Sequence, residues 1–212
     1  MVRKWIGYIG VGSLMCAALG CGILYTRQAR LQQAISDKVL RFHVLANSDS
    51  EADQNLKLAV RDAVGSYMQE KLADVENLEE CELVVRQSLG EIEEAAAETI
   101  AENGYDYDVT AELEHTSFPV KNYGSYTFPA GDYEALRIVI GEGNGHNWWC
   151  VMYPNMCFSD SMYEVVDEEA GEKLREVLTT EEYEKMLAEG DYQVRMKYFS
   201  WLNPYLEKLD EN

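Results

Sequence analysis

Basic residues are scarce in this 212-residue chain, which has 18 Lys and Arg against 38 Asp and Glu and a formal net charge of -20. Four of the basic residues, Arg3, Lys4, Arg27 and Arg30, lie in the first thirty residues, which contain no acid. The remainder is strongly acidic, and such a surface is repelled by phosphate backbones and anionic lipid headgroups. We therefore expect no nucleic-acid partner. A neutral or basic protein partner fits the charge, which can also serve solubility alone.

The sequence also lacks the spacings that metal and phosphate sites require. Its three histidines, at positions 43, 115 and 146, are scattered without zinc-ligand spacing. The glycines of residues 141–145 fit neither a dinucleotide fingerprint nor a P-loop, because position 146 is histidine and no Lys-Ser/Thr pair follows. The alternating acids of residues 49–53 begin like a calcium loop, but positions 54 and 60 are glutamine and valine. We expect neither a metal nor a cofactor.

The first thirty residues are typical of an export or anchoring segment. Arg3 and Lys4 precede an uncharged apolar run over residues 5–25, which as a helix would span roughly 30 Å, the thickness of a hydrocarbon core. The run can be cleaved after the small residues at 18–20, lipidated at Cys21 or retained as an anchor. We expect residues 1–30 to be a signal peptide or membrane anchor and residues 31–212 a single extracytoplasmic domain that meets a membrane only through this segment.

Periodicity in the body predicts an α+β fold, with a mixed or antiparallel sheet packed by two long helices and a C-terminal helix. Predicted strands cover residues 39–46, 105–118, 133–140, 148–153 and 194–198, and the strand at 148–153 is expected to return from the strand at 133–140 as a hairpin. Predicted helices cover residues 51–71 and 83–100, one or two more cover 168–189, and a short terminal helix lies near Pro204. Residues 123–129 read as an aromatic loop.

The region from Gly141 to Phe158 concentrates the potential chemistry of the chain. A hydrolase would use Cys150 as nucleophile, with His146 or His115 as the base and Asn147 or a carboxylate to orient it. This is disfavoured because a catalytic cysteine commonly sits at a helix N-terminus, whereas Cys150 falls in a predicted strand. The alternatives are a disulfide between Cys150 and Cys157, expected outside the cytoplasm, or two buried free thiols. We expect the disulfide and no catalytic residue.

Two adjacent tryptophans lie in the same region. Trp148 and Trp149 point to opposite faces if they belong to a strand, which would put one ring in the core and leave the other for solvent or a partner. Burial of both rings in the core explains them equally well. His43, inside the first predicted strand, is expected to be a core or sheet-face histidine rather than a ligand.

Two blocks of the sequence resemble the stage II sporulation protein R family. The first comprises residues 41–50, which read Arg-Phe-His-Val-Leu-Ala-Asn-Ser-Asp-Ser, with residues 53–54, 56–58 and 60–64. The second comprises residues 131–143, 147–151 and 157–158, including Asn147-Trp148-Trp149-Cys150-Val151. The resemblance runs from about residue 41 to residue 158, behind the export segment.

The resemblance implies a signalling protein and not an enzyme. Members of this family would be made in the forespore and exported across the forespore membrane into the space between the two sporulation membranes. There they would activate a membrane-embedded aspartic protease of the mother cell, which processes the precursor of an early sigma factor. The family motif assigns no activation site. From their position we expect a partner-binding surface at Asn47, Ser48, Asp49, His146, Asn147, Trp148 and Trp149.

Overall fold

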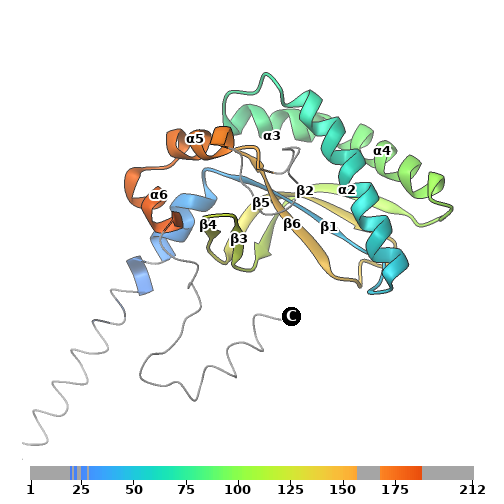
Figure 1. The fold of residues 1–212 in the computed structure, drawn as a ribbon, viewed down its shortest axis with the longest axis horizontal. Helices are drawn as coiled ribbons and strands as arrows, with labels where there is room; N and C mark the ends of the chain where they lie inside the picture. Colours follow the sequence, from blue (N-terminus) through green and yellow to red (C-terminus); the bar gives the residue numbers. More distant parts are fainter. Residues whose placement is uncertain (1–19, 21, 23–24, 28, 157–167, 188–212) are drawn as a thin grey trace, which may run out of the picture.

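The apolar strand β1 (Leu40–Leu45) lies inside a four-stranded mixed sheet with the order β2-β5-β1-β6 (Figure 1). The other strands are β2 (Val109–Phe118), β5 (Gly131–Ile140) and β6 (Asn147–Tyr153). β1 is parallel to β5 and antiparallel to β6, and β2 is antiparallel to β5. The computed structural model describes residues 20, 22, 25–27, 29–156 and 168–187. The α+β class with a mixed sheet is confirmed.

Helix α2 (Glu51–Lys71) begins where the sequence predicts it. Ser50 is its N-cap, and the Ser50 side chain accepts a hydrogen bond from the Asp53 backbone N–H at 3.1 Å. Acids in the first turn also complement the positive end of the helix dipole. The helix packs through a buried stripe that recurs at helical spacing, formed by Leu56, Val60, Val64 and Met68.

The second predicted helix is in fact two helices, α3 (Leu78–Gln87) and α4 (Leu89–Glu102), which meet at Ser88. The Ser88 N–H donates to the carbonyls of both Val84 and Val85, which ends α3, and the chain turns directly into α4. Helices α2, α3 and α4 cover one face of the sheet (Figure 1). Their apolar residues pack on Phe42 and Val44 of β1 and on Leu136 and Ile138 of β5.

The other face carries a second core at one end of the sheet. It is formed by a helix over residues 29–36, the small sheet of β3 (Lys121–Tyr123) and β4 (Tyr126–Phe128), and helices α5 (Glu168–Val177) and α6 (Thr180–Leu187). The expected aromatic loop is therefore a hairpin, with Gly124 at φ 55° in its turn. Of the one or two helices expected over residues 168–189, the structure has two, and α6 begins with a capping box in which Thr179 and Glu182 exchange hydrogen bonds.

The prediction that β5 and β6 form a hairpin is wrong. β1 lies between them and pairs with both, so that Phe42 is opposite Leu136 on one side and Cys150 on the other. The loop of residues 141–146 consequently crosses the end of β1 instead of closing a tight turn. This crossing places the second sequence block against the first.

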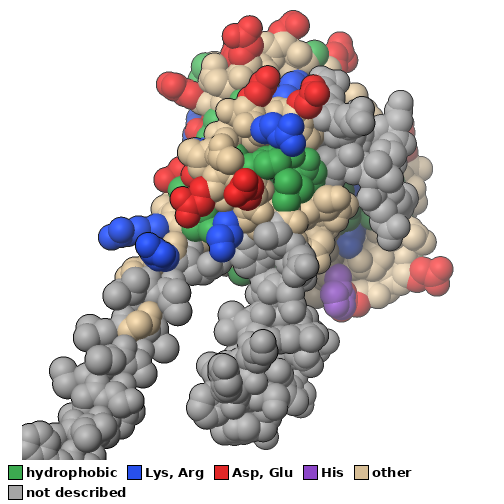
Figure 2. All heavy atoms as spheres, turned by 60° about the vertical axis from the view of Figure 1, so that its left-hand side comes forward, with side chains coloured by type: hydrophobic (Ala, Val, Ile, Leu, Met, Phe, Trp, Pro, Cys, Tyr) green, Lys and Arg blue, Asp and Glu red, His purple; other side chains and the backbone are tan. Residues whose placement is uncertain are grey.

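Several predictions fall on residues outside the described part of the chain. They are the apolar run up to residue 19, Cys157, the strand at 194–198 and the helix near Pro204. Within the described ranges, no helix combines the length and apolar character needed to cross a membrane. Figure 2 shows acidic side chains over much of one face of the body, with a few Lys and Arg side chains among them.

Candidate functional site

Two loops that are almost a hundred residues apart in the sequence lie against each other at one edge of the sheet. Because β1 and β5 are parallel, the loops that follow them, residues 46–50 and 141–146, emerge at the same edge. The Asn144 N–H donates to the Asn47 carbonyl at 3.1 Å, and the Gly145 N–H donates to the Ala46 carbonyl at 2.9 Å. We call the surface formed by residues 46–50 and 141–147 the loop edge.

Asn47 joins the two loops through its side chain. Its Oδ1 accepts a hydrogen bond from the Glu142 N–H at 3.0 Å, and its Nδ2 donates to Asp53 Oδ2 at 2.9 Å. Gly141, at φ 57°, gives the amide room, since a Cβ at Gly141 would lie 2.3 Å from Asn47 Oδ1. A single side chain thus connects the loop after β1, the loop after β5 and the first turn of α2.

Asp53 is buried beneath the loop edge and accepts several hydrogen bonds. Ser48 Oγ donates to it at 2.5 Å, Asn47 Nδ2 at 2.9 Å and the Tyr107 hydroxyl at 3.2 Å. These bonds favour the ionised carboxylate, so the pKa of Asp53 is below its ordinary value, with the Ser48 bond as the largest cause. Asp53 is a structural acid whose acceptor atoms are used within the protein.

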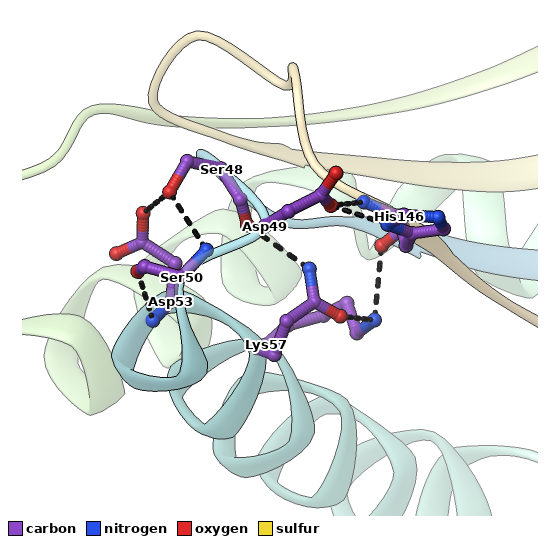
Figure 3. Close-up of polar contacts among 7 residues, drawn as sticks. Ser48, Asp49, Ser50, Asp53, Lys57 and His146 are labelled. Atoms are coloured by element: carbon purple, nitrogen blue, oxygen red, sulfur yellow. Dashed lines mark hydrogen bonds and ion pairs between the residues drawn. The ribbon is translucent and has the colours of Figure 1, made fainter.

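Asp49 and His146 join the loops on the exposed side (Figure 3). Asp49 Oδ1 accepts a hydrogen bond from the His146 backbone N–H at 2.6 Å and also contacts His146 Nδ1. The bond to the His146 side chain is the largest reason why the pKa of Asp49 is lowered. Both side chains remain largely solvent-exposed, at 55% and 78% of their full area, so other groups on them can still meet a partner.

Lys57 supports the loop edge from α2. Its Nζ donates to the His146 carbonyl at 2.9 Å and to Gln54 Oε1 at 2.6 Å, and Gln54 Nε2 donates to the Ser48 carbonyl at 3.0 Å (Figure 3). Burial is the main cause of the lowered pKa of Lys57. The helix therefore holds both loops through one short chain of polar contacts.

The two tryptophans lie on opposite faces of β6, as the sequence predicts. Trp148 packs edge-on against Phe42, with ring centroids 5.5 Å apart, and the Arg61 guanidinium lies 5.0 Å from its ring centre. On the other face Trp149 stacks on His43, with ring centroids 5.0 Å apart and an angle of 6° between the ring planes. Both tryptophans are half-buried. Both tryptophans lie next to the loop edge, and each indole ring packs on the protein on one side.

The described residues do not assemble the cysteine–histidine pair of a hydrolase. Cys150 is buried on β6 in register with Phe42, whereas the His146 ring is held by Asp49 in the loop. His115 lies on β2, and two strands separate β2 from β6. The Met156 N–H donates to the Val151 carbonyl at 3.2 Å, so the chain bends after β6. Since Cys157 lies outside the described residues, the pairing of Cys150 stays a prediction.

Other reactive groups in the described part of the chain are inert or isolated. Cys81 is a free thiol buried in α3, where burial raises its pKa to about 12. Such a thiol stays protonated and is a poor nucleophile. No group of three or more His, Cys, Asp or Glu side chains within the described ranges is arranged to hold a metal ion.

The structure brings together Asn47, Ser48, Asp49, His146 and Asn147, five of the seven residues predicted for a partner surface, and places Trp148 and Trp149 beside them. Sequence reasoning missed Lys57 and Tyr107. Nothing local in the sequence indicates that Lys57 reaches a carbonyl 89 positions away.

Comparisons with known proteins agree with the two sequence blocks. The family model described as Stage II sporulation protein R matches residues 36–163, which include β1 to β6 and the whole loop edge. The chain is 41% identical over 147 residues to the Stage II sporulation protein R of Bacillus subtilis (strain 168). That alignment covers 67% of this chain and 66% of the relative, slightly less than two thirds of its length. No solved structure matches the chain.

The matched region, which includes the whole sheet and the loop edge, defines the class as a stage II sporulation protein. The chain belongs to the stage II sporulation protein R family.

Proposed function

We propose that this protein is an exported sporulation signal that activates a membrane-embedded aspartic protease of the mother cell. The activated protease would then process the precursor of an early sigma factor. The protein would act in the space between the two sporulation membranes, either secreted or held there by its N-terminal segment. Membership of the stage II sporulation protein R family is the single observation that carries this proposal.

The loop edge is the surface that we assign to the receptor. Its exposed residues include Asp49, Glu142, Asn144 and His146. Asn47 and Lys57 hold the backbone of the last three, and Asp49 accepts a hydrogen bond from the His146 N–H. A surface ordered before binding loses little conformational entropy on association, so more of its contact energy contributes to affinity. Activation by binding would require only this rigid surface and no chemistry from the protein itself.

The alternative, a cell-wall or peptide hydrolase that uses Cys150 and His146, has less support. Cys150 is buried in the sheet, and His146 contacts Asp49 instead of a nucleophile. A Cys150→Ser, Cys157→Ser double variant separates the two functions. A hydrolase would lose all activity, whereas an activator that still folds would keep signalling.

Reconstitution in a non-sporulating host tests the proposal directly. The protease and the sigma-factor precursor are co-expressed with or without this protein, and precursor processing is followed by immunoblot. We expect processing only when the protein is present. Replacement of apolar residues in the run 5–25 by charged residues, which would block export, is expected to abolish it.

Unchanged processing in the absence of the protein, or continued processing by the export-blocked variant, would contradict the proposal. The mass of the mature N-terminal peptide would show whether residues 1–30 are removed, lipidated at Cys21 or retained. The mass measurement tests only where the protein is located. The processing assay tests whether the protein activates the protease.

A further inference from the structure

Arg41 is a completely buried cation on the face of the sheet opposite α2. Its Nε donates to the Cys150 carbonyl at 2.9 Å and its Nη2 to the Tyr123 hydroxyl at 3.0 Å. The guanidinium lies 4.4 Å from the Phe118 ring centre and 5.0 Å from that of Tyr133. No carboxylate contacts it among the described residues, and Nη1 has no hydrogen-bond partner. Buried charges are normally paired, so this arrangement leaves a positive potential without a counter-charge.

His43 and Asn147 add unused polar atoms beside Arg41. His43 is two positions along β1 on the same face and 2% exposed, and within the described ranges neither of its ring nitrogens makes a hydrogen bond of ordinary geometry. Burial lowers the pKa of His43 to about 4, although the neighbouring Asn147 side chain acts in the opposite direction, so the ring is neutral and keeps one N–H to donate. Asn147 Oδ1 is also buried, beside the His43 ring, and among the described residues no bond to it has ordinary hydrogen-bond geometry. Buried polar groups in proteins are almost always satisfied, and these groups gather behind one tryptophan.

Lys121 lies at the surface of this group. Its Nζ is 5.9 Å from the centre of the Trp149 ring, the same ring that stacks on His43. Lys121 is half-buried and forms no ion pair with any residue that the structure describes. Burial is the main cause of its lowered pKa, and the charge of Arg41 lowers it further. An anion placed here would relieve the repulsion between these two cations.

We propose that Lys121, Trp149 and the buried Arg41 behind them form a docking site for a carboxylate side chain on an acidic segment of a partner protein. The carboxylate would pair with Lys121 at the edge of Trp149 and lie in the field of Arg41. Charge complementarity carries this assignment, because unpaired donors and cations gather here in a chain of net charge -20. The acids of the same face, Glu112 and Glu114, already contact Arg137 at 3.7 and 3.4 Å.

The site is distinct from the loop edge in its chemistry. The loop edge presents the carboxylates Asp49 and Glu142, whereas the Lys121 site presents cations and an aromatic ring. A partner with a basic patch and an acidic segment could therefore contact both surfaces at once. The inference does not depend on the partner being a protease.

A binding experiment with the full chain tests the site. The probe is a short synthetic peptide with three consecutive glutamates, and the comparison is the same peptide with glutamines. Binding is followed by the NMR shift of the Trp149 indole N–H. We expect a saturable shift with the glutamate peptide only. Loss of one exposed ion pair corresponds to a roughly two- to fivefold weaker affinity, which we expect for Lys121→Gln.

Lys71→Gln is the matched control, because Lys71 also lies over an aromatic ring, 5.3 Å from the centre of Tyr67, and its loss changes the net charge equally. We expect it to bind like wild type, and we expect Lys121→Arg to retain binding within about twofold of wild type because the charge is kept. Three results would each overturn the site: an equal shift with the glutamine peptide, equal weakening by Lys71→Gln, or no saturable shift of Trp149.

Discussion

Replacement of Gly145 by alanine should separate the two loops of the loop edge. A Cβ at this position would lie 2.3 Å from the Ser48 carbonyl oxygen, 2.5 Å from the Ser48 carbonyl carbon and 2.9 Å from the Ala46 Cβ. Two of these atoms belong to the backbone, which cannot rotate away as a flexible side chain can. The Gly145 N–H donates to the Ala46 carbonyl at 2.9 Å, so any shift that relieves the clash also stretches this bond.

The expected loss of stability combines these two effects. Overpacking of this kind typically destabilises by about 1–3 kcal/mol. Loss of the hydrogen bond adds about 0.5–1.5 kcal/mol. We therefore expect Gly145→Ala to lower the free energy of unfolding by about 2–4 kcal/mol, which for a domain of this size lowers Tm by roughly 5–15 °C.

Urea and thermal denaturation followed by circular dichroism measure this change, and Gly90→Ala provides the control. Gly90 lies in the first turn of α4, and a Cβ there would meet no atom within 4 Å. Alanine at this position should leave the stability unchanged or raise it by up to about 1 kcal/mol. If Gly145→Ala were as stable as wild type, the two loops could not be packed as described.

Three further changes test other parts of the structure. Asn47→Ala removes two side-chain hydrogen bonds and should destabilise the protein by about 1–3 kcal/mol in urea denaturation, whereas Asn144→Ala, whose side chain makes no described bond, should not. His43 has a folded pKa of about 4, so between pH 6.5 and 4 the unfolded chain binds a proton at this residue that the folded protein does not. The free energy of unfolding should therefore fall by about 3 kcal/mol as pH is lowered from 6.5 to 4, and His43→Gln should remove this pH dependence. The pKa of Asp53 is lowered chiefly by the Ser48 bond, so the ionised carboxylate stabilises the folded protein above the unfolded pKa, and this stabilisation is lost as pH falls through the folded pKa. Asp53→Asn should therefore reduce the fall in the free energy of unfolding at acidic pH.

Local sequence signals predict the elements well but not their neighbours in the sheet. The apolar strand β1, the Ser50 cap and the stripe of α2 follow from propensity and spacing over a few residues. The insertion of β1 between β5 and β6 depends on contacts between residues about a hundred positions apart in the sequence. The periodicity of a single strand contains no information about such contacts. For the same reason the hairpin prediction failed although both strands were identified.

The candidate site was predicted in part for a similar reason. Polar residues after β1 and around residues 141–147 mark two loops, and the resemblance to one family suggests that both matter. The contacts of Lys57 and Asn47 across the loops require the fold. Arg41 alternates with apolar neighbours as a solvent-facing residue of a strand would. Its burial is explained by the β3 and β4 hairpin together with aromatic rings of β2 and β5, which pack around it.

The most direct test of the central claim is sigma-precursor processing by His146→Ala in the reconstituted host, measured beside His115→Ala. The two histidine side chains are comparably exposed, His146 at 78% and His115 at 75% of their full area, and each contacts a single acid of its own. His115, however, lies on β2, away from the loop edge. If the loop edge binds the receptor, His146→Ala should reduce processing strongly while the exported protein stays folded, and His115→Ala should process as wild type. Equal processing by wild type, His146→Ala and His115→Ala would contradict the claim.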